Sequence, residues 1–588
     1  LLFIKFKVQS SKFKVQSSMF KVIKLPKFKY SAKMLLVWLW VVWKGNRLQA
    51  VLNAAMGLLS VGVSLAQVWA VKRAIDVASH SVEGNVYWAV GLMGLLILCD
   101  FALSVGSIWI RNVLGIRAQN RMQQRMLNRI LRSEWHGREK MHSGDVLNRL
   151  ESDVNKVVDF LTETLPNTLG VLAMFLGAFF YLFSMDKMLS VVIVIMIPIF
   201  LAFSKIYMNK MRYLTRLVRD SDSQVQSVLQ ETIQHRMLVK TLQAEEPMVE
   251  KLEETQRRLR GNVMVRTKFN VLSNFFLNFG FALGYLVAFL WAALRMGAGT
   301  LTFGGMTAFL QLVNKIQTPA RNLTKLAPAF VGVFTAAERL MELEENPLEE
   351  QGEPLQMPAP CGIRLDDISY AYDKDEFSDS QRQQVRNIIH HLSFDFRPGS
   401  CTAILGETGA GKTTLIRLIL ALLHPQEGKV TIYNKVGDEI RNQAELSPLH
   451  RCNFVYVPQG NTLMSGTIRD NLRLGKIGAT DEEMRAALHQ SCADFVFDLP
   501  DGLDTLCSEQ GGGLSEGQAQ RIAIALSLLR NRCIMLFDEA TSALDPETER
   551  QLLQNILSSH DKTIIFITHR PAVIEYCDQT LKIKRNVD

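Results

Sequence analysis

A glycine-rich run in the second half of the chain has the residue types that bind a chain of phosphates. The run is Gly406, Glu407, Thr408, Gly409, Ala410, Gly411, Lys412, Thr413 and Thr414. Glycines let backbone N–H groups turn onto phosphate oxygens, the Lys412 ammonium reaches the outer phosphates, and the Thr413 hydroxyl is a ligand for Mg²⁺. The run therefore predicts a site for ATP or GTP, with Mg²⁺ as the accompanying ion. A glycine-rich turn that matches by chance is the competing interpretation.

Three apolar runs farther along the chain also end on polar residues that suit phosphate chemistry. The run 454–457 leads to Gln459, the run 534–537 leads to Asp538 and Glu539, and the run 564–567 leads to His569. In open parallel sheets, ligands bind beyond the carboxyl ends of the strands. We therefore expect these side chains and the glycine-rich run to converge on one edge of a sheet.

If the site hydrolyses a nucleoside triphosphate, each of the four residues at these strand ends has a predicted role. Asp538 is placed to bind Mg²⁺, and Glu539 is placed to polarise the attacking water. His569 would stabilise the γ-phosphate, and Gln459 would approach both Mg²⁺ and the water from a loop. Each residue alone has a structural alternative, because an Asp-Glu pair often caps a helix and a lone histidine is more often structural. All four in this order make a chance match negligible.

The elements that must hold these residues belong to a domain of alternating strands and helices. From residue 361 to residue 588, short apolar runs alternate with helical patterns, which is typical of a doubly wound α/β domain. The preceding stretch, 342–360, is rich in Glu and Pro and is expected to be an exposed linker. The chain has eight cysteines and no CxxC pair, so we expect reduced cytosolic thiols without a metal or redox role.

Residues 34–341 contain six mostly apolar stretches, and a helical membrane span takes about 20 such residues. The stretches lie near residues 48–71, 86–110, 164–184, 187–207, 268–294 and 303–325. The segments 111–163 and 208–267 are long, helical in pattern and rich in Arg and Lys, which places them and both termini in the cytosol. The sequence thus predicts an all-α domain of six transmembrane helices with long cytoplasmic helical extensions. It also predicts a multi-pass protein of the bacterial inner membrane.

Asp100 lies in the middle of the second apolar stretch. A carboxylate at that depth must face a partner or a water-filled cavity. Two roles remain open for Asp100, one toward a substrate or ion and one that is structural, with the carboxyl hydrogen-bonded or protonated.

Residues 1–33 form a basic tail with nine Lys and no acidic residue, in a chain of net charge +9. Such a tail would face anionic lipid headgroups rather than nucleic acid, or it would be disordered and solvated. The sequence KFKVQSS occurs twice in succession within it, so the tail is also interpreted as an artefact, with Met19 or Met34 as the true start.

Taken together, these motifs resemble the full set of an ABC ATPase. Besides the residues above, the set includes Leu514-Ser515-Glu516-Gly517-Gln518 and the segment 542–545 (SALD). By this resemblance, Ser515, Gly517 and Gln518 form a signature loop at a helix N-terminus, which closes over the γ-phosphate of ATP bound by the other subunit. Tyr372 sits where the family has an aromatic residue that stacks on adenine. The chain departs from the family in Glu516, where a glycine is commoner, and in a longer polar stretch, 373–386.

The membrane half resembles exporter-type ABC proteins. Residues 142–154 (HSGDVLNRLESDV) are similar to the family's (S/T)GExxxRxxxDV stretch after the first cytoplasmic tip, and residues 230–246 are similar to the second tip. Six spans followed by one ATPase make a half-transporter, which by this resemblance must dimerise. The resemblance implies ATP-driven export of a small-molecule, lipid or peptide substrate by a homodimer, with a heterodimer possible and no nucleic-acid partner.

Other functions share parts of this pattern. A soluble ABC ATPase would have the same nucleotide motifs, but it would lack the six spans. A channel or regulator of the ABC type would hydrolyse ATP without pumping. One half of a heterodimeric thiol, amino-acid or peptide exporter, or an importer built on the exporter fold, would show the same motifs as this chain.

Overall fold

The computed structural model describes residues 29–135, 143–372, 388–407, 409–437, 439–507, 513–558 and 561–584. Within these ranges, the side chains of residues 32, 143, 189, 192–209, 277, 319–328 and 436 are not described. The basic tail up to residue 28, Thr408 and the polar stretch 373–386 therefore lie outside the described residues.

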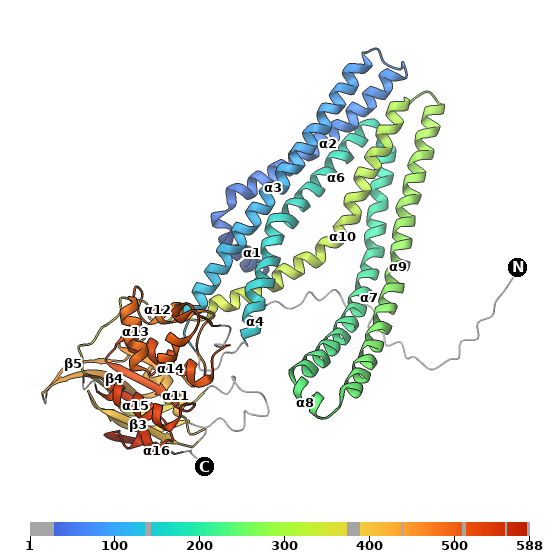
Figure 1. Ribbon diagram of the computed structural model, residues 1–588. Helices are drawn as coiled ribbons and strands as arrows, with labels where there is room; N and C mark the ends of the chain where they lie inside the picture. The colour runs from blue at the N-terminus through green and yellow to red at the C-terminus, as the bar shows by residue number, and fades with distance from the viewer. Residues whose placement is uncertain are drawn as a thin grey trace. The chain divides into compact units, whose positions relative to one another are not determined.

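The chain forms two compact units (Figure 1). A helical unit comprises Leu1–Leu127 and Leu147–Leu343, and a sheet unit comprises Asn128–Val146 and Glu344–Asp588. Part of the first long basic segment thus belongs with the sheet unit. The limits drawn from the sequence, which are 34–341 for a membrane domain, 342–360 for a linker and 361–588 for a nucleotide domain, stay predictions.

The described part of residues 32–345 is mainly helical. Its helices are α1 (Ala32–Val42), η1 (Trp43–Gly45), α2 (Arg47–Ala78), α3 (Val86–Arg132), α4 (Ser143–Asn148), η2 (Arg149–Asp153), α5 (Val154–Asp159), η3 (Phe160–Thr164), α6 (Leu165–Met185), α7 (Lys187–Gln234), α8 (Arg236–Thr241), α9 (Glu245–Gly297) and α10 (Phe303–Glu345). The parts of α3, α4 and α10 within Asn128–Val146 or after Leu343 belong to the sheet unit. In the described part of the chain, four helical stretches are long and apolar enough to cross a membrane: Arg47–Ala78, Val86–Arg132, Gly144–Met185 and Glu245–Gly297. These contain the first, second, third and fifth predicted spans. The fourth and sixth fall on α7 and α10, and many of their side chains lie outside the described residues.

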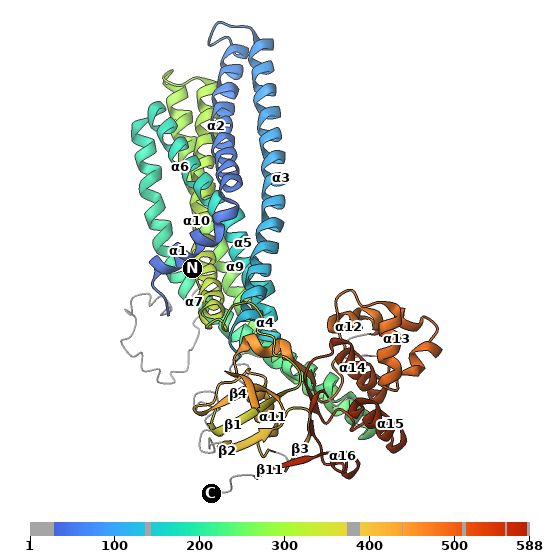
Figure 2. The same cartoon turned by 90° about the vertical axis from the view of Figure 1, so that its left-hand side faces the viewer.

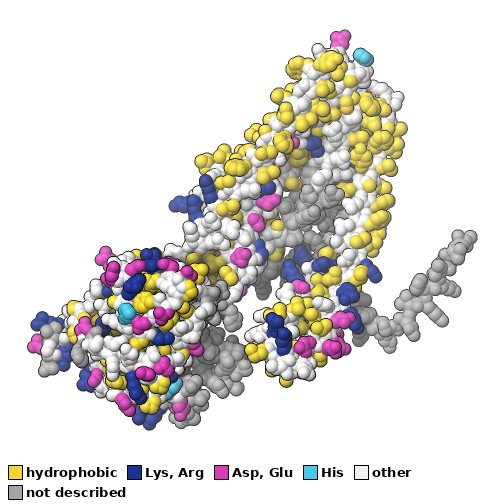
Figure 3. All heavy atoms as spheres, viewed as in Figure 1, with side chains coloured by type: hydrophobic (Ala, Val, Ile, Leu, Met, Phe, Trp, Pro, Cys, Tyr) yellow, Lys and Arg dark blue, Asp and Glu magenta, His cyan; other side chains and the backbone are white. Residues whose placement is uncertain are grey.

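Large apolar side chains cover the outside of the helical unit. On α3, Leu98, Phe101 and Trp109 are 67%, 69% and 73% exposed. Figure 3 shows hydrophobic side chains over most of the length of this unit, with charged side chains gathered toward one end. An apolar surface of this extent suits contact with lipid rather than water, because hydrocarbon does not penalise it.

Small side chains lie where the helices of this unit touch. Ala178 of α6, Ala288 of α9 and Ala308 of α10 belong to one buried cluster, and small residues let membrane helices approach closely. Near the C-terminus of α2, the backbone N–H of Gly304 donates a 3.0 Å hydrogen bond to Asp76 Oδ1. A Cβ at Gly304 would lie 2.4 Å from that oxygen, so only glycine permits this tie between α2 and α10.

Several helices are longer than a membrane requires. α7 has 48 residues and α9 has 53, whereas about 20 residues cross the hydrocarbon core. α7 packs against α9, and Figure 1 shows the pair running side by side as far as α8. The helical extensions predicted for the second and fourth spans are therefore present, and α9 and α10 are extended in the same way.

The sheet unit is built on two sheets and a short strand pair. Its strands are β1 (Cys361–Tyr370), β2 (Ile389–Phe396), β3 (Cys401–Gly406), β4 (Glu427–Val436), β5 (Glu439–Glu445), β6 (Phe454–Val457), β7 (Gly466–Thr467), β8 (Leu506–Cys507), β9 (Ile534–Asp538), β10 (Thr563–Ile567) and β11 (Gln579–Ile583). Its helices are α11 (Lys412–Ile419), η6 (Pro448–Asn453), α12 (Ile468–Gly475), α13 (Asp481–Gln490), η7 (Asp494–Asp498), η8 (Gly502–Asp504), α14 (Glu516–Arg530), α15 (Pro546–Leu557) and α16 (Pro571–Ile574). One sheet is parallel, with the order β11-β3-β10-β9-β6, and the other is antiparallel, with the order β2-β1-β4-β5.

The parallel sheet is buried on both faces. In β9, Ile534 and Leu536 join a core cluster with α11 and the antiparallel sheet, whereas Met535 and Phe537 join a second cluster with α15. Side chains alternate along a strand, so a sheet covered on both faces needs continuous apolar runs. This confirms the predicted α/β domain. The sequence patterns did not predict the antiparallel sheet, because its pairing depends on long-range contacts.

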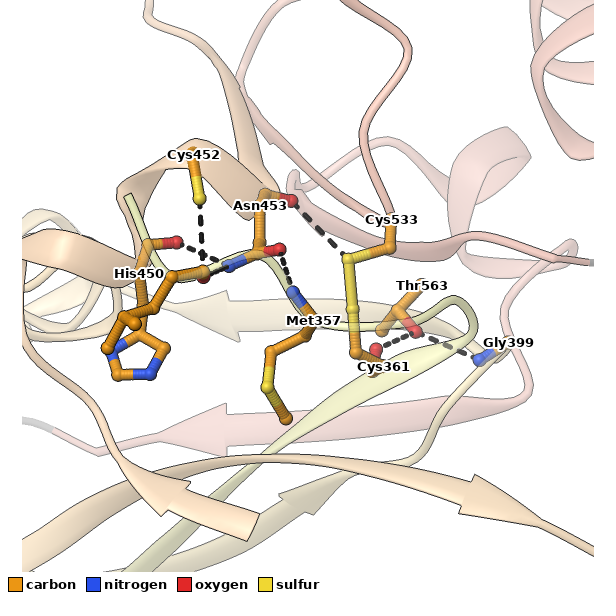
Figure 4. Close-up of a disulfide and its surroundings, with 9 residues drawn as sticks. Met357, Cys361, Gly399, His450, Cys452, Asn453, Cys533 and Thr563 are labelled. Atoms are coloured by element: carbon orange, nitrogen blue, oxygen red, sulfur yellow. Dashed lines mark hydrogen bonds between the residues drawn. A yellow bond between two sulfur atoms is a disulfide. The ribbon is translucent and has the colours of Figure 1, made fainter. Parts of the chain in front are cut away.

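A disulfide joins Cys361 and Cys533 (Figure 4). Cys361 begins β1 and Cys533 directly precedes β9, so the bond links the two sheets. Their Cα atoms are 6.0 Å apart although the residues are 172 positions apart in sequence. At the same corner, the Thr563 hydroxyl donates to the carbonyl of Cys361 at 2.7 Å and accepts from the N–H of Gly399 at 2.9 Å. The expectation of eight reduced thiols is wrong for this pair, because spacing along the chain carries no information about a contact created by packing two sheets.

Candidate active site

The glycine-rich loop connects β3 to α11. Gly409 and Gly411 have φ of 84° and 97°, where any residue with a side chain is strained. At Gly411, a Cβ would also lie 2.8 Å from a methyl carbon of Ile388. The loop leads directly into the N-terminus of α11, whose dipole favours negative charge. Lys412 Nζ donates a 2.7 Å hydrogen bond to the carbonyl of Gly406, so the ammonium lies over the loop.

Glu539 lies between the other two residues with a predicted catalytic role. Gln459 Nε2 donates to Glu539 Oε2 at 2.9 Å, and His569 Nε2 is 3.4 Å from Glu539 Oε1. The backbone turns sharply at Glu539, which has a φ of 47° and donates its N–H to the carbonyl of Ile567 at 3.0 Å. The structure thus brings together three side chains that are distant in sequence and fixes both oxygens of one carboxylate.

Asp538 is the last residue of β9 and is 7% exposed. Burial raises the pKa of Asp538 above its ordinary value, and the charge of Glu539 raises it further, whereas Tyr456 and Lys412 oppose the shift. The Tyr456 hydroxyl donates to Asp538 Oδ2 at 3.3 Å. Burial also raises the pKa of Tyr456, which keeps the phenol protonated as a donor. Sequence reasoning missed Tyr456, because an aromatic residue in an apolar strand looks like a core residue.

Thr413 and Thr414 in the first turn of α11 differ in burial. Thr413 is exposed, whereas Thr414 is buried and its hydroxyl lies 3.3 Å from that of Tyr372. Arg417 Nη1 donates to the Tyr372 hydroxyl at 3.1 Å, and the Arg417 guanidinium lies 4.4 Å from the ring centre of Trp135. Tyr372 is itself buried in the sheet unit, so its stacking on adenine stays a prediction.

The signature segment caps a helix. Ser515 Oγ accepts from the N–H of Gln518 at 3.2 Å, and Gln518 Oε1 accepts from the N–H of Ser515 at 2.9 Å, which is a capping box at the start of α14. Glu516 lies in the first turn, where the helix dipole favours a negative charge. A Cβ at Gly517 would lie 2.8 Å from the carbonyl oxygen of Ala543, so glycine is required there. Within the described chain, Ser515 and Gln518 bond each other rather than the glycine-rich loop.

Two protein-family models match the chain. Residues 51–320 match the ABC transporter transmembrane region, and residues 389–542 match the ABC transporter model. The chain belongs to the ABC transporters. It is an exporter-type half-transporter with fused transmembrane and ATP-binding regions, and it therefore works in ATP-driven export with a second half.

Similar ABC transporters have different named cargoes. The antigen peptide transporter 2 of Mus musculus is 28% identical over 87% of this chain and 72% of its own length. The ATP-dependent lipid A-core flippase of Bordetella avium (strain 197N) is 27% identical over 92% of this chain and 89% of its own length. The structure of a bacterial Atm1-family ABC exporter with ATP bound aligns with a TM-score of 0.74 at 24% identity, covering 91% of this chain and 94% of that one. These likenesses support the fold and leave the substrate open.

The helical unit of the transporter contains a cavity of about 410 Å³ and another of about 910 Å³. The larger cavity lies between α2, α3, α6 and α10, and its lining mixes apolar side chains with hydroxyl and amide groups and includes Arg111 and Lys315. Asp100 accepts a 2.8 Å hydrogen bond from Ser60, which lines this cavity. Asp100 thus has a hydrogen-bonding partner at the cavity wall, and both of its predicted roles remain open.

Proposed function

We propose that the transporter works as a dimer in which two ATP molecules are held between the chains. ATP and Mg²⁺ would lie at residues 406–414 of one chain, and residues 515–518 of the other chain would close over the γ-phosphate. A homodimer is favoured because one chain carries every motif that a complete site needs, and a heterodimer is the alternative. The observation that carries the hydrolytic part of this proposal is the placement of Glu539 between Gln459 and His569.

Glu539 is the residue best placed to act on the attacking water. Its carboxylate would accept a hydrogen bond from the water and polarise it. Gln459 already holds one carboxylate oxygen at 2.9 Å, which fixes the direction of the other. His569, 3.4 Å from that second oxygen, would contact the γ-phosphate. Hydrolysis in such sites depends mainly on positioning and on charge stabilisation, which these contacts supply.

The residues of the site fit Mg²⁺. This ion prefers oxygen ligands, and proteins usually hold it through one or two side chains plus substrate phosphates. Asp538 offers a buried carboxylate, Thr413 an exposed hydroxyl and Gln459 an amide oxygen. The described residues contain no group of three or more His, Cys, Asp or Glu side chains that could hold a metal, so the ion would be shared with the nucleotide. When bound, it would neutralise phosphate charge.

The decisive test of this proposal is Glu539→Gln. The substitution keeps the shape of the side chain and removes its charge, so ATP binding should stay within about threefold of the wild-type value while hydrolysis falls about 10²–10⁴-fold. Nucleotide binding and phosphate release would be measured on the same reconstituted protein. Glu547→Gln, on the exposed first turn of α15, is the matched control and should hydrolyse ATP normally. Normal hydrolysis by Glu539→Gln would reject the role.

The dimer has a separate test. The chain expressed alone should run at twice its 66.4 kDa mass when ATP is bound and hydrolysis is blocked. A chain that stays monomeric and inactive until a second half-transporter is added would instead support the heterodimer.

We place the substrate in the cavity of about 910 Å³, a size in the range of about 300–1,000 Å³ that drug-sized ligands occupy. Arg111, 3.4 Å from Glu163, and Lys315, close to Asp100, lie beside apolar walls. A small molecule, lipid or peptide with an anionic group next to an apolar part would compete with these carboxylates for the two cations. Stimulation of the ATPase by anionic but not cationic amphiphiles in proteoliposomes would support this assignment, and the reverse order would reject it.

We also place the sheet unit in the cytosol, and a bacterial inner membrane stays the predicted location. Arg129 and Arg132 in the last turn of α3 belong to the basic segments that support this orientation. Accessibility of single cysteines on either side of sealed vesicles would check it.

A further inference from the structure

The cavity of about 410 Å³ in the helical unit takes no part in the function proposed above. It is formed by the chain corner at residues 41–46, by one side of α3 and by residues 157–161, and we call it the corner cavity. Its walls are mainly Val, Met and Leu side chains, and its cationic lining residues are Lys44, Arg121 and Arg125. All of its lining residues are described, and none of them is acidic.

The helix α1 indicates that the corner cavity lies at the level of lipid headgroups. Its Trp40 is 61% exposed, whereas Trp38 and Trp43 are buried. The Arg47 guanidinium lies 4.4 Å from the ring centre of Trp40 and donates to its carbonyl at 3.0 Å. Figure 2 shows α1 running across the direction of α2 rather than along it. Aromatic and cationic residues on such a helix, next to the start of a span, mark the membrane interface.

The Arg121 side chain, which lines this cavity, is held in place by two contacts. Its Nη1 donates a 3.3 Å hydrogen bond to Oδ1 of Asn46, which is itself buried. A Cβ at Gly45 would lie 1.5 Å from the same nitrogen, so the guanidinium packs directly on the backbone of the chain corner. A guanidinium has five N–H donors in a fixed fork that matches phosphate oxygens. In the described chain, Asn46 uses one of these donors, and the others can serve a ligand.

We propose that the corner cavity binds one anionic phospholipid of the surrounding bilayer. The lipid phosphate would lie between Lys44 and Arg121, and an acyl chain would lie along the apolar wall. Apolar walls favour a lipid over a free phosphate ion, and a lining with positive charge and no acid favours an anionic over a zwitterionic headgroup. The lipid binds independently of the transported substrate and of the ATP cycle.

Native mass spectrometry of the intact transporter tests this assignment. The protein would be reconstituted in nanodiscs of phosphatidylcholine with or without phosphatidylglycerol. It would then be released from the nanodiscs in the mass spectrometer, and the mass of the protein with its retained lipid would be measured. The wild-type chain should retain phosphatidylglycerol in preference to phosphatidylcholine. Arg121→Gln should lower that retention about tenfold or more, because the loss of a charge-assisted hydrogen bond weakens binding by about that factor. Arg121→Lys should restore part of it.

Two further variants separate geometry from net charge. Gly45→Ala leaves every charge in place but displaces the guanidinium, and it should lose phosphatidylglycerol as Arg121→Gln does. Lys210→Gln removes a charge on α7 that is not in the lining of the cavity, and it should retain the lipid normally.

Equal retention by the wild-type chain, Arg121→Gln and Gly45→Ala would overturn the proposal. So would equal retention of the two lipids by the wild-type chain, or release of the bound lipid on addition of ATP, which would mark it as cargo. Because the readout is lipid mass and not hydrolysis, its failure is distinct from a failure of the proposed catalytic role of Glu539.

Discussion

The side-chain amide of Gln459 donates a 2.9 Å hydrogen bond to one carboxylate oxygen of Glu539, and the imidazole of His569 lies 3.4 Å from the other oxygen. Gln459 follows β6, Glu539 follows β9 and His569 follows β10. These are three neighbouring strands of the parallel sheet, with β9 in the middle. The carboxylate therefore has a fixed orientation in the fold of a single chain.

Removal of the Gln459 donor should slow turnover without preventing ATP binding. A hydrogen bond to a charged group is worth about 1.5–3 kcal/mol, so Gln459→Ala should lower kcat about 10–100-fold and change KM little. Gln459→Glu keeps the size of the side chain but places like charges together, so it should be more damaging and should recover in part as the pH falls. Steady-state phosphate release gives both constants. A kcat equal to that of the wild-type chain in both variants would contradict the positioning role.

The buried Asp538 should destabilise the nucleotide-free protein at neutral pH. Its pKa in the fold is raised, chiefly by burial, so the folded state binds this proton more tightly than the unfolded state, and stability falls as the pH rises above the ordinary value of 3.8. Asp538→Asn should therefore raise the thermal midpoint at pH 7 without nucleotide, and the gain should shrink toward acidic pH.

Asp538→Asn should also be stabilised less by MgATP than the wild-type chain is. ATP with Mg²⁺ should raise the midpoint of the wild-type chain more than that of Asp538→Asn, because a ligand stabilises the state that binds it. Thermal scans at several pH values, with and without MgATP, measure both effects. A midpoint for Asp538→Asn below that of the wild-type chain at pH 7 without nucleotide would contradict the assignment.

The disulfide between Cys361 and Cys533 predicts how the cysteines react. Alkylation after denaturation without a reductant should modify six of the eight cysteines, and prior reduction should expose the other two. Closing a long loop stabilises a fold by about 2–5 kcal/mol, so the double variant Cys361→Ser, Cys533→Ser should unfold more easily by that amount. Cys452→Ser, at a free cysteine of the same unit, is the control. Eight modified cysteines without a reductant would show that the bond is absent.

Replacement of Asp100 should affect transport more than folding. Asp100→Asn removes the charge but keeps an oxygen that can accept the 2.8 Å hydrogen bond from Ser60. Expression and thermal stability should therefore stay near the wild-type values, while stimulation of the ATPase by substrate changes. Unchanged transport in a normally expressed variant would remove Asp100 from the substrate pathway and leave it a structural role.

Much of the fold could be read from the sequence because its signals are local. A phosphate loop needs glycines and a lysine within a few positions, and membrane spans need about 20 apolar residues in succession. Both patterns are visible without a fold, as are the apolar strands that end at Gln459, Asp538 and His569. The roles predicted for these residues follow from the chemistry of their side chains, and the sequence gives the identity of each side chain.

Contacts between distant segments were decided only by the tertiary structure. Packing of the two sheets brought Cys361 to Cys533. Pairing of β6 with β9 within the parallel sheet placed the Tyr456 hydroxyl 3.3 Å from Asp538. Packing of helices laid Arg121 on the backbone of Gly45 and so formed a cationic cavity. None of these pairs has a characteristic spacing, because each depends on how whole elements pack, and the free energy of that packing is spread over many side chains rather than concentrated in a motif.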